Sequence, residues 1–366
     1  MKVRSEVLHY RLGLPSVRDS REERIPSQRE GFILHLSSSS GAEGWGEAAP
    51  LPGRSTESLS DVHDALGNVD RWLEDIDDPP PVPGWSHDVL DSLSAVSMSA
   101  SVRFAVESAV LDLLSRERGV VWSRDYARDY LRVLPMCALL PGAGKDVMAL
   151  FRTRMESGFN VFKIKVGDGR LEDDVACIRA MASLGGGGVV LRVDANRAWT
   201  LDDALAFADG VRQCGVAYIE EPVKLSADLT AFAAASPVPL ALDESLDGER
   251  NAVFSLRLAA AAYIIKPTLH GGISGALALC ERACRRGAVP VLSAAFESGI
   301  GIRSLVQIGA VMNFSPVAVG LDTWRWLRGD VLRQAPSFTK PRLDVHRIAE
   351  ATVRLNRRAS IDVATR

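Results

Sequence analysis

Three acidic residues lie at the ends of short apolar runs, spaced so that their side chains can meet. Asp194 ends the run VVLRVD, Glu220 lies in VAYIEE and Asp243 in PLALDE, at separations of 26 and 23 residues. On adjacent parallel strands these carboxylates would converge and repel each other unless a cation lay among them. An all-oxygen site suits Mg²⁺, with Mn²⁺ as an alternative, better than zinc. The other interpretation is a carboxylate cluster that lysines alone neutralise.

Lysines occupy the same kind of position in two other runs. Lys163 and Lys165 alternate in VFKIKV, so they point to one face of a strand, and Lys266 lies near the end of AYIIKP. Burial and a like-charged neighbour lower the pKa of a lysine, so Lys163 is expected to prepare Lys165 for general-base work. A cation beside such a base stabilises the negative charge that forms when the base removes a proton from the carbon next to a carboxylate. The predicted substrate is therefore a small-molecule carboxylate. The alternative for the pair is an edge strand with one solvated face.

Eight apolar runs would position these side chains, and helix-length segments separate them. Eight units within about 190 residues fit a barrel of alternating strands and helices, in which active sites lie at the carboxyl ends of the strands. The charged residues lie at those ends. A doubly wound sheet would alternate similarly, but the chain lacks its glycine fingerprint. The runs are VLPMCALL, VFKIKV, VVLRVD, VAYIEE, PLALDE, AYIIKP, VPVLSA and VAVGLD.

Composition narrows the class of protein. Hydrophobic residues make up 47% of the 366 residues and charged residues 24%, which is typical of a globular enzyme. A net charge of −3 gives no reason to expect nucleic acid or an anionic membrane as a partner, and no protein partner is predicted. No run approaches the ~18 apolar residues of a membrane span. Charges in the N-terminal segment, where a signal peptide is apolar, predict a cytoplasmic protein.

In order and spacing, the motifs KIK, VDAN, IEEP, LDES and IKP resemble those of the enolase superfamily, and within it the muconate-lactonising branch. The resemblance covers nearly the whole chain. It implies an N-terminal α+β capping domain over residues 1–105, with the segment 330–366 as a candidate addition. It also implies a (β/α)₇β barrel over residues 106–329.

The same resemblance implies roles for individual residues. Asp194, Glu220 and Asp243 match the Mg²⁺ ligands of the family, Lys165 matches its acid/base lysine, and Lys266 matches the lysine across the site. Supporting or substrate-binding roles are implied for Lys163, Arg192, Asn196, Glu221, Glu244, Ser293 and Gly320.

Finer segments resemble one member of that branch, a dehydratase of quinone biosynthesis. GWGEAAPLPGRSTESL resembles its capping segment, LRVDANRAW its third strand, and FESGIG with GLDT its last barrel loops. In such an enzyme a cyclohexadiene carboxylate that bears a hydroxyl and a succinyl group loses water and becomes aromatic. The resemblance implies that Lys165 removes the proton and then protonates the departing hydroxyl.

Three residues depart from this pattern or fall outside it. Relatives commonly carry serines before ESG, whereas Ser293 is followed here by two alanines, so a hydroxyl contact to the succinyl tail is missing or replaced by backbone amides. Arg192 would contact that tail or form an ion pair with Glu220 or Asp168. His270 shows no metal-ligand spacing and is expected on a loop surface, with a position in the lining of the active-site pocket as the alternative.

Other functions fit the same residues. An N-acylamino-acid racemase or dipeptide epimerase would use Lys165 and Lys266 as bases on opposite faces of the substrate, and a cycloisomerase is a third possibility. The loop at Val17–Arg29 and the FESGIG segment are expected to separate these activities, because they shape the substrate end. A barrel that binds a carboxylate without catalysis would be expected to have lost part of the acidic triad or a lysine, and this chain has lost neither.

Overall fold

A seven-stranded parallel sheet carries the lysines and carboxylates that the sequence singles out. In the computed structural model its order is β11-β10-β9-β8-β7-β6-β5. The structure describes residues 3–14, 27–74, 83–144, 146–247, 258–312, 317–336, 338–356 and 360–363. The strands are β5 (Ala138–Leu140), β6 (Val161–Lys165), β7 (Val190–Asp194), β8 (Val216–Glu220), β9 (Leu240–Leu242), β10 (Ala262–Ile265) and β11 (Val289–Leu292).

Val319 and Gly320 join the two edges of this sheet into a barrel. Met136 forms a parallel bridge with Val319, and Ser293 forms one with Gly320. The amide of Gly320 also donates to the carbonyl of Leu292 at 2.8 Å. The predicted (β/α)₇β barrel is therefore confirmed, and the last apolar run closes it through two residues rather than a long strand.

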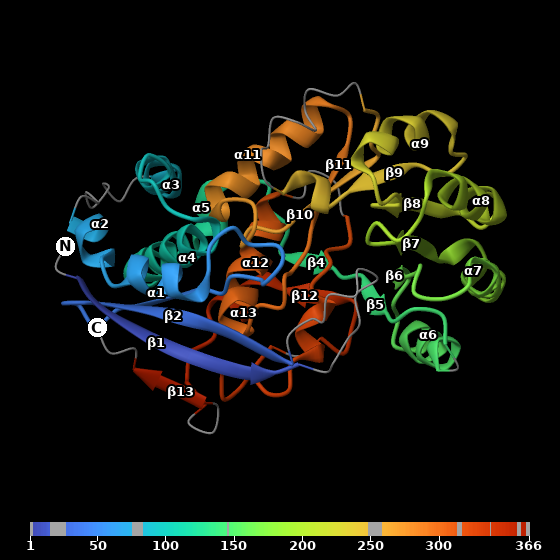
Figure 1. Cartoon of the computed structure of the whole chain (residues 1–366). Coiled ribbons are helices and arrows are strands. Elements are labelled where there is room, and N and C mark those ends of the chain that lie inside the picture. Colours follow the sequence, from blue (N-terminus) through green and yellow to red (C-terminus); the bar gives the residue numbers. More distant parts are fainter. Residues whose placement is uncertain are drawn as a thin grey trace.

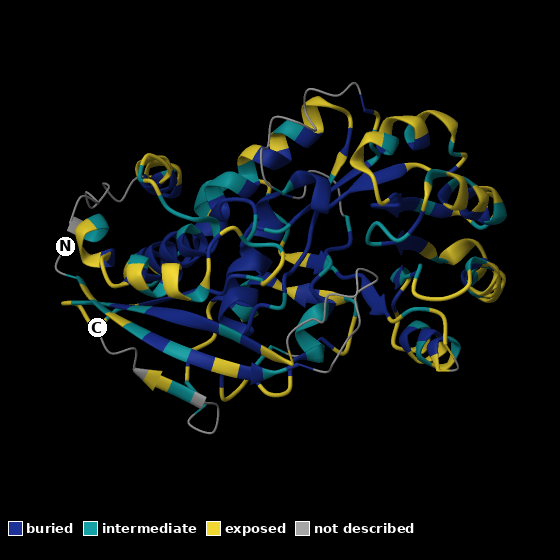
Figure 2. Ribbon diagram, viewed as in Figure 1, coloured by how far each residue is buried: buried dark blue, intermediate teal, exposed yellow. Residues whose placement is uncertain are grey.

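Helices cover the outside of the barrel, as the alternating pattern predicts. Figure 2 shows α6 to α9 with exposed outer faces around buried strands. In α8 the hydroxyl of Thr200 accepts a hydrogen bond from the amide of Asp203 at the start, while Phe207 and Val211 are buried. In the described residues, the α-helices from α5 onward are α5 (Trp122–Tyr126), α6 (Val147–Glu156), α7 (Leu171–Gly185), α8 (Leu201–Val211), α9 (Leu229–Ala235), α11 (Gly272–Arg285), α12 (Gly299–Met312) and α13 (Val345–Ala349).

An antiparallel sheet of order β13-β1-β2-β3 forms the N-terminal part, beside the barrel in Figure 1. Along β1, the buried residues Leu8, Tyr10 and Leu12 alternate with more exposed ones, because only one face meets the core. The C-terminal strand β13 pairs with β1. The elements are β1 (Val3–Gly13), β2 (Gln28–Ser38), β3 (Glu43–Ala48), α1 (Leu59–Leu66), α2 (Val69–Glu74), α3 (Trp85–Ser94) and β13 (Ser360–Val363).

Two glycines allow the long helix α4 (Ala100–Arg118) to lie directly on β3. A Cβ on Gly46 would lie 1.9 Å from the carbonyl oxygen of Ala105, and one on Gly44 would lie 2.1 Å from that of Ala109. Only glycine fits such an approach. Helix α4 also contacts α11 of the barrel and runs through residue 105. The division into domains at 105/106 therefore stays a prediction.

The predicted run 133–140 differs from the structure. It is divided into β4 (Val133–Pro135), which pairs with β12 (Arg342–Asp344), and β5 in the barrel. Pro135 has no amide hydrogen to continue a ladder, which accounts for an interruption there. No helix in the described ranges is long and apolar enough to cross a membrane. Most of the predicted loop Val17–Arg29 lies outside the described residues.

Candidate active site

The carboxyl ends of five consecutive strands bring the predicted residues together. Lys165, Asp194 and Glu220 lie side by side in register as the last residues of β6, β7 and β8. Asp243 and Lys266 are the first residues after β9 and β10. The strand order therefore places a lysine on either side of three acidic residues, which are all buried.

The ammonium group of Lys163 bridges two of the carboxylates. Its Nζ lies 2.9 Å from Oδ2 of Asp194 and 2.7 Å from Oε2 of Glu220. Its side chain is 16% exposed, whereas both carboxylates are at most 1% exposed. In such a dry surrounding, the charge of Lys163 lowers the pKa of both carboxylates, although burial and the charge of Asp194 still raise the pKa of Glu220 well above its usual value.

Lysines also pair with the outer carboxylates. Nζ of Lys165 lies 3.2 Å from Oδ2 of Asp194 and donates to the side chain of Asn196, while Nζ of Lys266 lies 2.5 Å from Oδ2 of Asp243. The sequence thus predicts correctly that the lysines flank the acidic residues. Whether lysines alone neutralise this cluster, or a cation also binds there, stays a prediction.

The pKa of Lys165 is set by burial and by nearby charges. Burial lowers it most, and the charge of Lys163 lowers it further, but the carboxylates of Asp194, Glu220 and Glu244 together outweigh both and the pKa is raised. For Asp194, burial would raise the pKa, yet Lys163 and Lys165 bring it down to about 2. The lowering of the Lys165 pKa is expected beside a divalent cation bound to these carboxylates, and it stays a prediction.

A metal ion would have to displace these ammonium groups. Within the described ranges, no three histidine, cysteine, aspartate or glutamate side chains are gathered closely enough to hold a metal as they stand. The set of donors still fits a divalent cation, because the carboxylates of Asp194 and Glu220 both face one positively charged group, the ammonium of Lys163. The three buried carboxylates offer only oxygen donors, which are the ligands that Mg²⁺ prefers.

Arg54, which the sequence interpretation missed, adds a fourth cation. It lies between β3 and α1, and its Nη2 is 3.1 Å from Oδ1 of Asp243. Its Nη1 is 3.6 Å from Oε1 of Glu244, and its Nε donates to Asp247. No local signal marks Arg54, because its partners lie 189 or more residues away along the chain.

His270 is buried, so the predicted surface position is wrong. Its Nδ1 accepts from the amide of Lys266 at 3.0 Å, and its Nε2 lies 3.1 Å from Oδ1 of Asp247. Burial lowers the pKa of His270, although Asp247 raises it. A neutral ring that accepts at Nδ1 and donates at Nε2 satisfies both contacts and fixes the backbone of Lys266.

Two predicted supporting residues adopt left-handed backbone conformations. Asn196 and Glu221 both have φ of 43°, which is uncommon for residues other than glycine. Asn196 donates from Nδ2 to Glu244 at 3.0 Å, and Glu221 accepts from the amide of Asp243 at 2.9 Å. Glu221 also pairs with Arg197 at 2.9 Å. These contacts hold the backbone that carries the acidic residues.

Arg192 and Ser293, which the sequence also predicts, both donate to backbone carbonyls. Arg192 donates to the carbonyl of Ala318 at 2.7 Å and lies over the ring of Tyr218. This hydrogen bond goes to a backbone carbonyl and not to Glu220 or Asp168, the ion-pair partners that the sequence predicts for Arg192. The hydroxyl of Ser293 donates to the carbonyl of Gly320 at 3.2 Å, at the seam that closes the barrel.

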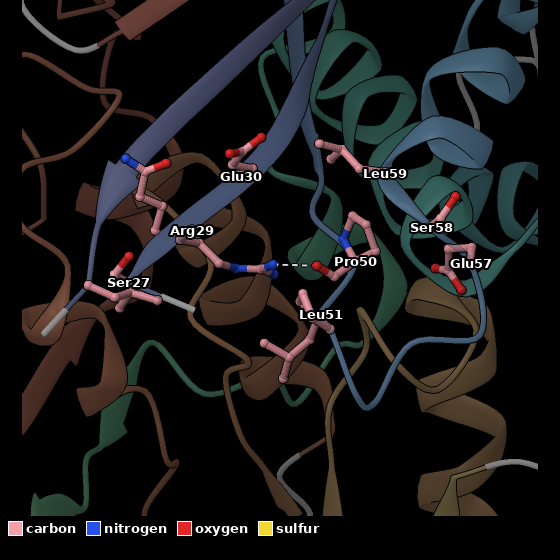
Figure 3. A pocket seen from close by; sticks show the side chains of 11 residues that line it. Ser27, Arg29, Glu30, Pro50, Leu51, Glu57, Ser58 and Leu59 are labelled. Atoms are coloured by element: carbon pink, nitrogen blue, oxygen red, sulfur yellow. Dashed lines mark hydrogen bonds between the residues drawn. The ribbon is translucent and has the colours of Figure 1, made fainter. Parts of the chain in front are cut away.

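A cavity of about 600 Å³ lies in the N-terminal part, and none of the lysines or acidic residues above lines it. At its wall, Arg29 donates to the carbonyl of Pro50 (Figure 3). Nε of Arg29 also donates to the carbonyl of Phe296 at 3.2 Å, so the cavity wall is tied to the FESGIG segment. The lining residues are Leu14, Ser27, Gln28, Arg29, Glu30, Pro50, Leu51, Pro52, Glu57, Ser58 and Leu59.

Two family models match the chain. One described as "Enolase C-terminal domain-like" matches residues 146–349, and one described as "MenC, N-terminal domain" matches residues 3–110. The first takes in all five strand ends of the site.

Similar proteins cover most of the chain. An o-succinylbenzoate synthase of Citrobacter koseri is 32% identical, over 88% of this chain and 91% of that protein. Protein PHYLLO, chloroplastic, of Arabidopsis thaliana is 30% identical over 83% of this chain, which spans only 20% of that protein. The solved L-Ala-D/L-Glu epimerase of Bacillus subtilis has a TM-score of 0.77 at 24% identity, over 93% of this chain and 96% of that one. The likeness to the solved structure is one of fold.

Proposed function

The chain belongs to the o-succinylbenzoate synthases of the enolase superfamily, which are carbon–oxygen lyases, and from this premise we propose its reaction. The substrate is 2-succinyl-6-hydroxy-2,4-cyclohexadiene-1-carboxylate, which loses water to become 2-succinylbenzoate in menaquinone or phylloquinone biosynthesis. The observation that carries the proposal is the placement of Lys165 and Lys266 on either side of three buried acidic residues.

Asp194, Glu220 and Asp243 would hold Mg²⁺, with Mn²⁺ as an alternative. When bound, the ion supplies positive charge that stabilises the negative charge developing on the substrate carboxylate. Lys165 and Lys266 are then no longer needed to neutralise the acidic residues. With the carboxylates neutralised, burial and the charge of Lys163 would favour loss of the Lys165 proton, so Lys165 can turn to the substrate as an amine while Lys266 keeps its charge.

Lys165 performs both proton transfers. As an amine, its Nζ takes the proton from the ring carbon that bears the carboxylate, and the C–H electron pair passes into the ring system. The bond from the neighbouring carbon to the hydroxyl then breaks. Lys165, now an ammonium group, gives its proton to the departing oxygen, so water leaves and the amine is restored. The side chain of Asn196, which accepts from Lys165, holds Nζ in place.

Lys266 keeps its charge throughout this reaction. From the opposite side it stabilises the negative charge that spreads over the ring. Its backbone is fixed by His270, which accepts a hydrogen bond from the Lys266 amide.

Racemisation of an N-acylamino acid, or epimerisation of a dipeptide, is the second candidate. The observation that favours it is the same pair of lysines, because Lys165 could remove the α-proton and Lys266 could return one from the other face. The first half of both reactions is identical, so the substrate decides between them.

Proton NMR in D₂O tests both candidates in one design. The purified chain with Mg²⁺ is given the cyclohexadiene substrate or an N-succinyl amino acid, with Lys165→Ala as the control. We expect aromatic signals of 2-succinylbenzoate to grow with the wild-type chain alone. Aromatic signals no faster than in the control would contradict the dehydratase proposal, and loss of only the amino-acid α-proton signal would favour the racemase.

A further inference from the structure

Asp243 is held by cations on both carboxylate oxygens. Oδ2 accepts from Nζ of Lys266 at 2.5 Å, and Oδ1 lies 3.1 Å from Nη2 of Arg54. Lys266 comes from the barrel, whereas Arg54 comes from the N-terminal part. The side chain of Arg54 is only 13% exposed, so water screens its charge weakly.

Arg54 has further partners on the same barrel segment. Its Nε donates to Asp247, and its Nη1 lies near Glu244. The guanidinium group of Arg54 could therefore move away from Asp243 and still be paired with a carboxylate. A dication bound to Asp243, by contrast, would face a guanidinium group at ion-pair distance from its ligand, and the two like charges would repel each other.

The loop that carries Arg54 is internally bonded. The amides of Arg54 and Ser55 both donate to the carbonyl of Leu51, at 3.0 and 2.8 Å, and the amide of Leu51 donates to the hydroxyl of Ser55 at 2.8 Å. The segment 51–55 contributes Leu51 and Pro52 to the wall of the cavity in Figure 3, and the side chain of Arg54 links it to Asp243 and Asp247 of the barrel.

We propose that Arg54 competes with the metal ion for Asp243, and thereby lowers the metal affinity of the site and ties the position of the segment 51–55 to metal binding. The proposal rests on the proposed function, which assigns Asp243 to the metal. Without metal, Arg54 docks the segment against the barrel. With metal bound, Arg54 gives up Asp243 and keeps Asp247, and the segment loses part of its attachment.

Calorimetric titration with MgCl₂ tests the competition without relying on activity. We expect Arg54→Met to bind Mg²⁺ roughly tenfold more tightly than the wild type. Nη1 of Arg54 also donates to Oδ2 of Asp243 at 3.4 Å, so the contact is bidentate. Arg54→Lys keeps the charge but loses this bidentate contact, so its affinity should lie between them. Arg197→Met is the matched control, because it removes a cation from the same region that pairs with Glu221 rather than with Asp243.

Hydrogen–deuterium exchange of segment 51–55 is the second measurement. In the wild type, we expect Mg²⁺ to speed exchange there. In Arg54→Met, exchange should be fast already and unaffected by Mg²⁺. An unchanged or weaker affinity in Arg54→Met, or an equal gain in Arg197→Met, overturns the competition. No Mg²⁺ binding by any variant would instead overturn the metal assignment of the proposed function, and this inference with it.

Discussion

Lys163 is the residue on which the balance of charge at the strand ends most depends. Its ammonium group pairs with Asp194 and Glu220 at once, and both are buried. Lys163→Met would leave two carboxylates without this partner, and breaking a buried pair in this way costs about 3–5 kcal/mol. We expect denaturant unfolding without metal to show a loss of this size.

Two comparisons make that prediction specific. Lys224→Met removes an exposed lysine and should change the unfolding free energy by less than ~0.5 kcal/mol. Added Mg²⁺ should stabilise Lys163→Met more than the wild type, because the ion would replace the missing charge. A loss in Lys163→Met no larger than in Lys224→Met would show that the acidic residues do not need the Lys163 charge.

At this scale the sequence predicts residues that share one strand end, and it misses those that reach the site from elsewhere. Lys165 and Asp194 are found because alternation and run ends fix where their side chains point. Arg54 reaches Asp243 from a different part of the chain, and His270 is buried by contacts with Lys266 and Asp247. Only the tertiary structure brings these groups together.

At the scale of elements, the contact of α4 with β3 leaves no space for a side chain. Gly46→Ala would place a Cβ 1.9 Å from the Ala105 carbonyl, so the helix must shift. We expect a loss of at least ~2 kcal/mol in unfolding free energy, measured by denaturant titration. Gly169→Ala, with nothing within 4 Å of its Cβ, is the control and should be near neutral. Equal stability of the two variants would refute this packing argument.

Glu107 links α4 to the start of α11 and gives stability a pH dependence. Its carboxylate accepts from the amide of Ser274 at 3.0 Å and from the hydroxyl at 2.5 Å. Burial nevertheless raises the pKa of Glu107 from 4.5 to about 7. The folded state thus binds the proton more tightly than the unfolded state, and the stability this contributes is present below pH 4.5 and is lost as the pH rises through about 7.

The variant Glu107→Gln does not titrate and isolates this effect. Between pH 4.5 and 7.5 we expect the wild type to lose up to about 3 kcal/mol relative to the variant, in unfolding curves measured at each pH. Parallel stability curves for the two proteins would contradict the raised pKa.

The barrel strands follow closely from the sequence because each is a short apolar run with a charged end. β6 and β7 lie within the predicted runs VFKIKV and VVLRVD. The first run fails because Pro135 and the pairing of β4 with β12 divide it. The last run shortens to the bridges of Val319 and Gly320, since barrel closure depends on geometry that no single run encodes.

At the scale of the whole molecule, the N-terminal part contributes charge as well as cover to the barrel. Glu47 of β3 accepts from the amides of Ser298 and Gly301 at the start of α12, and Arg54 reaches Asp243. The motif resemblance predicts a capping domain over a barrel, and this arrangement is found. Sequence patterns do not specify such contacts between distant segments, because they report local periodicity and not the docking of one layer on another.

The central claim is that this chain dehydrates its substrate at a magnesium site built on the barrel strand ends. Its most direct test is the initial rate of 2-succinylbenzoate formation, followed by ultraviolet absorbance, as Mg²⁺ is removed with a chelator and then restored. We predict that the rate falls to that of Lys165→Ala after chelation and rises to saturation as Mg²⁺ is added back. A rate no higher than that of Lys165→Ala at every Mg²⁺ concentration, or a full rate in excess chelator, would contradict the account.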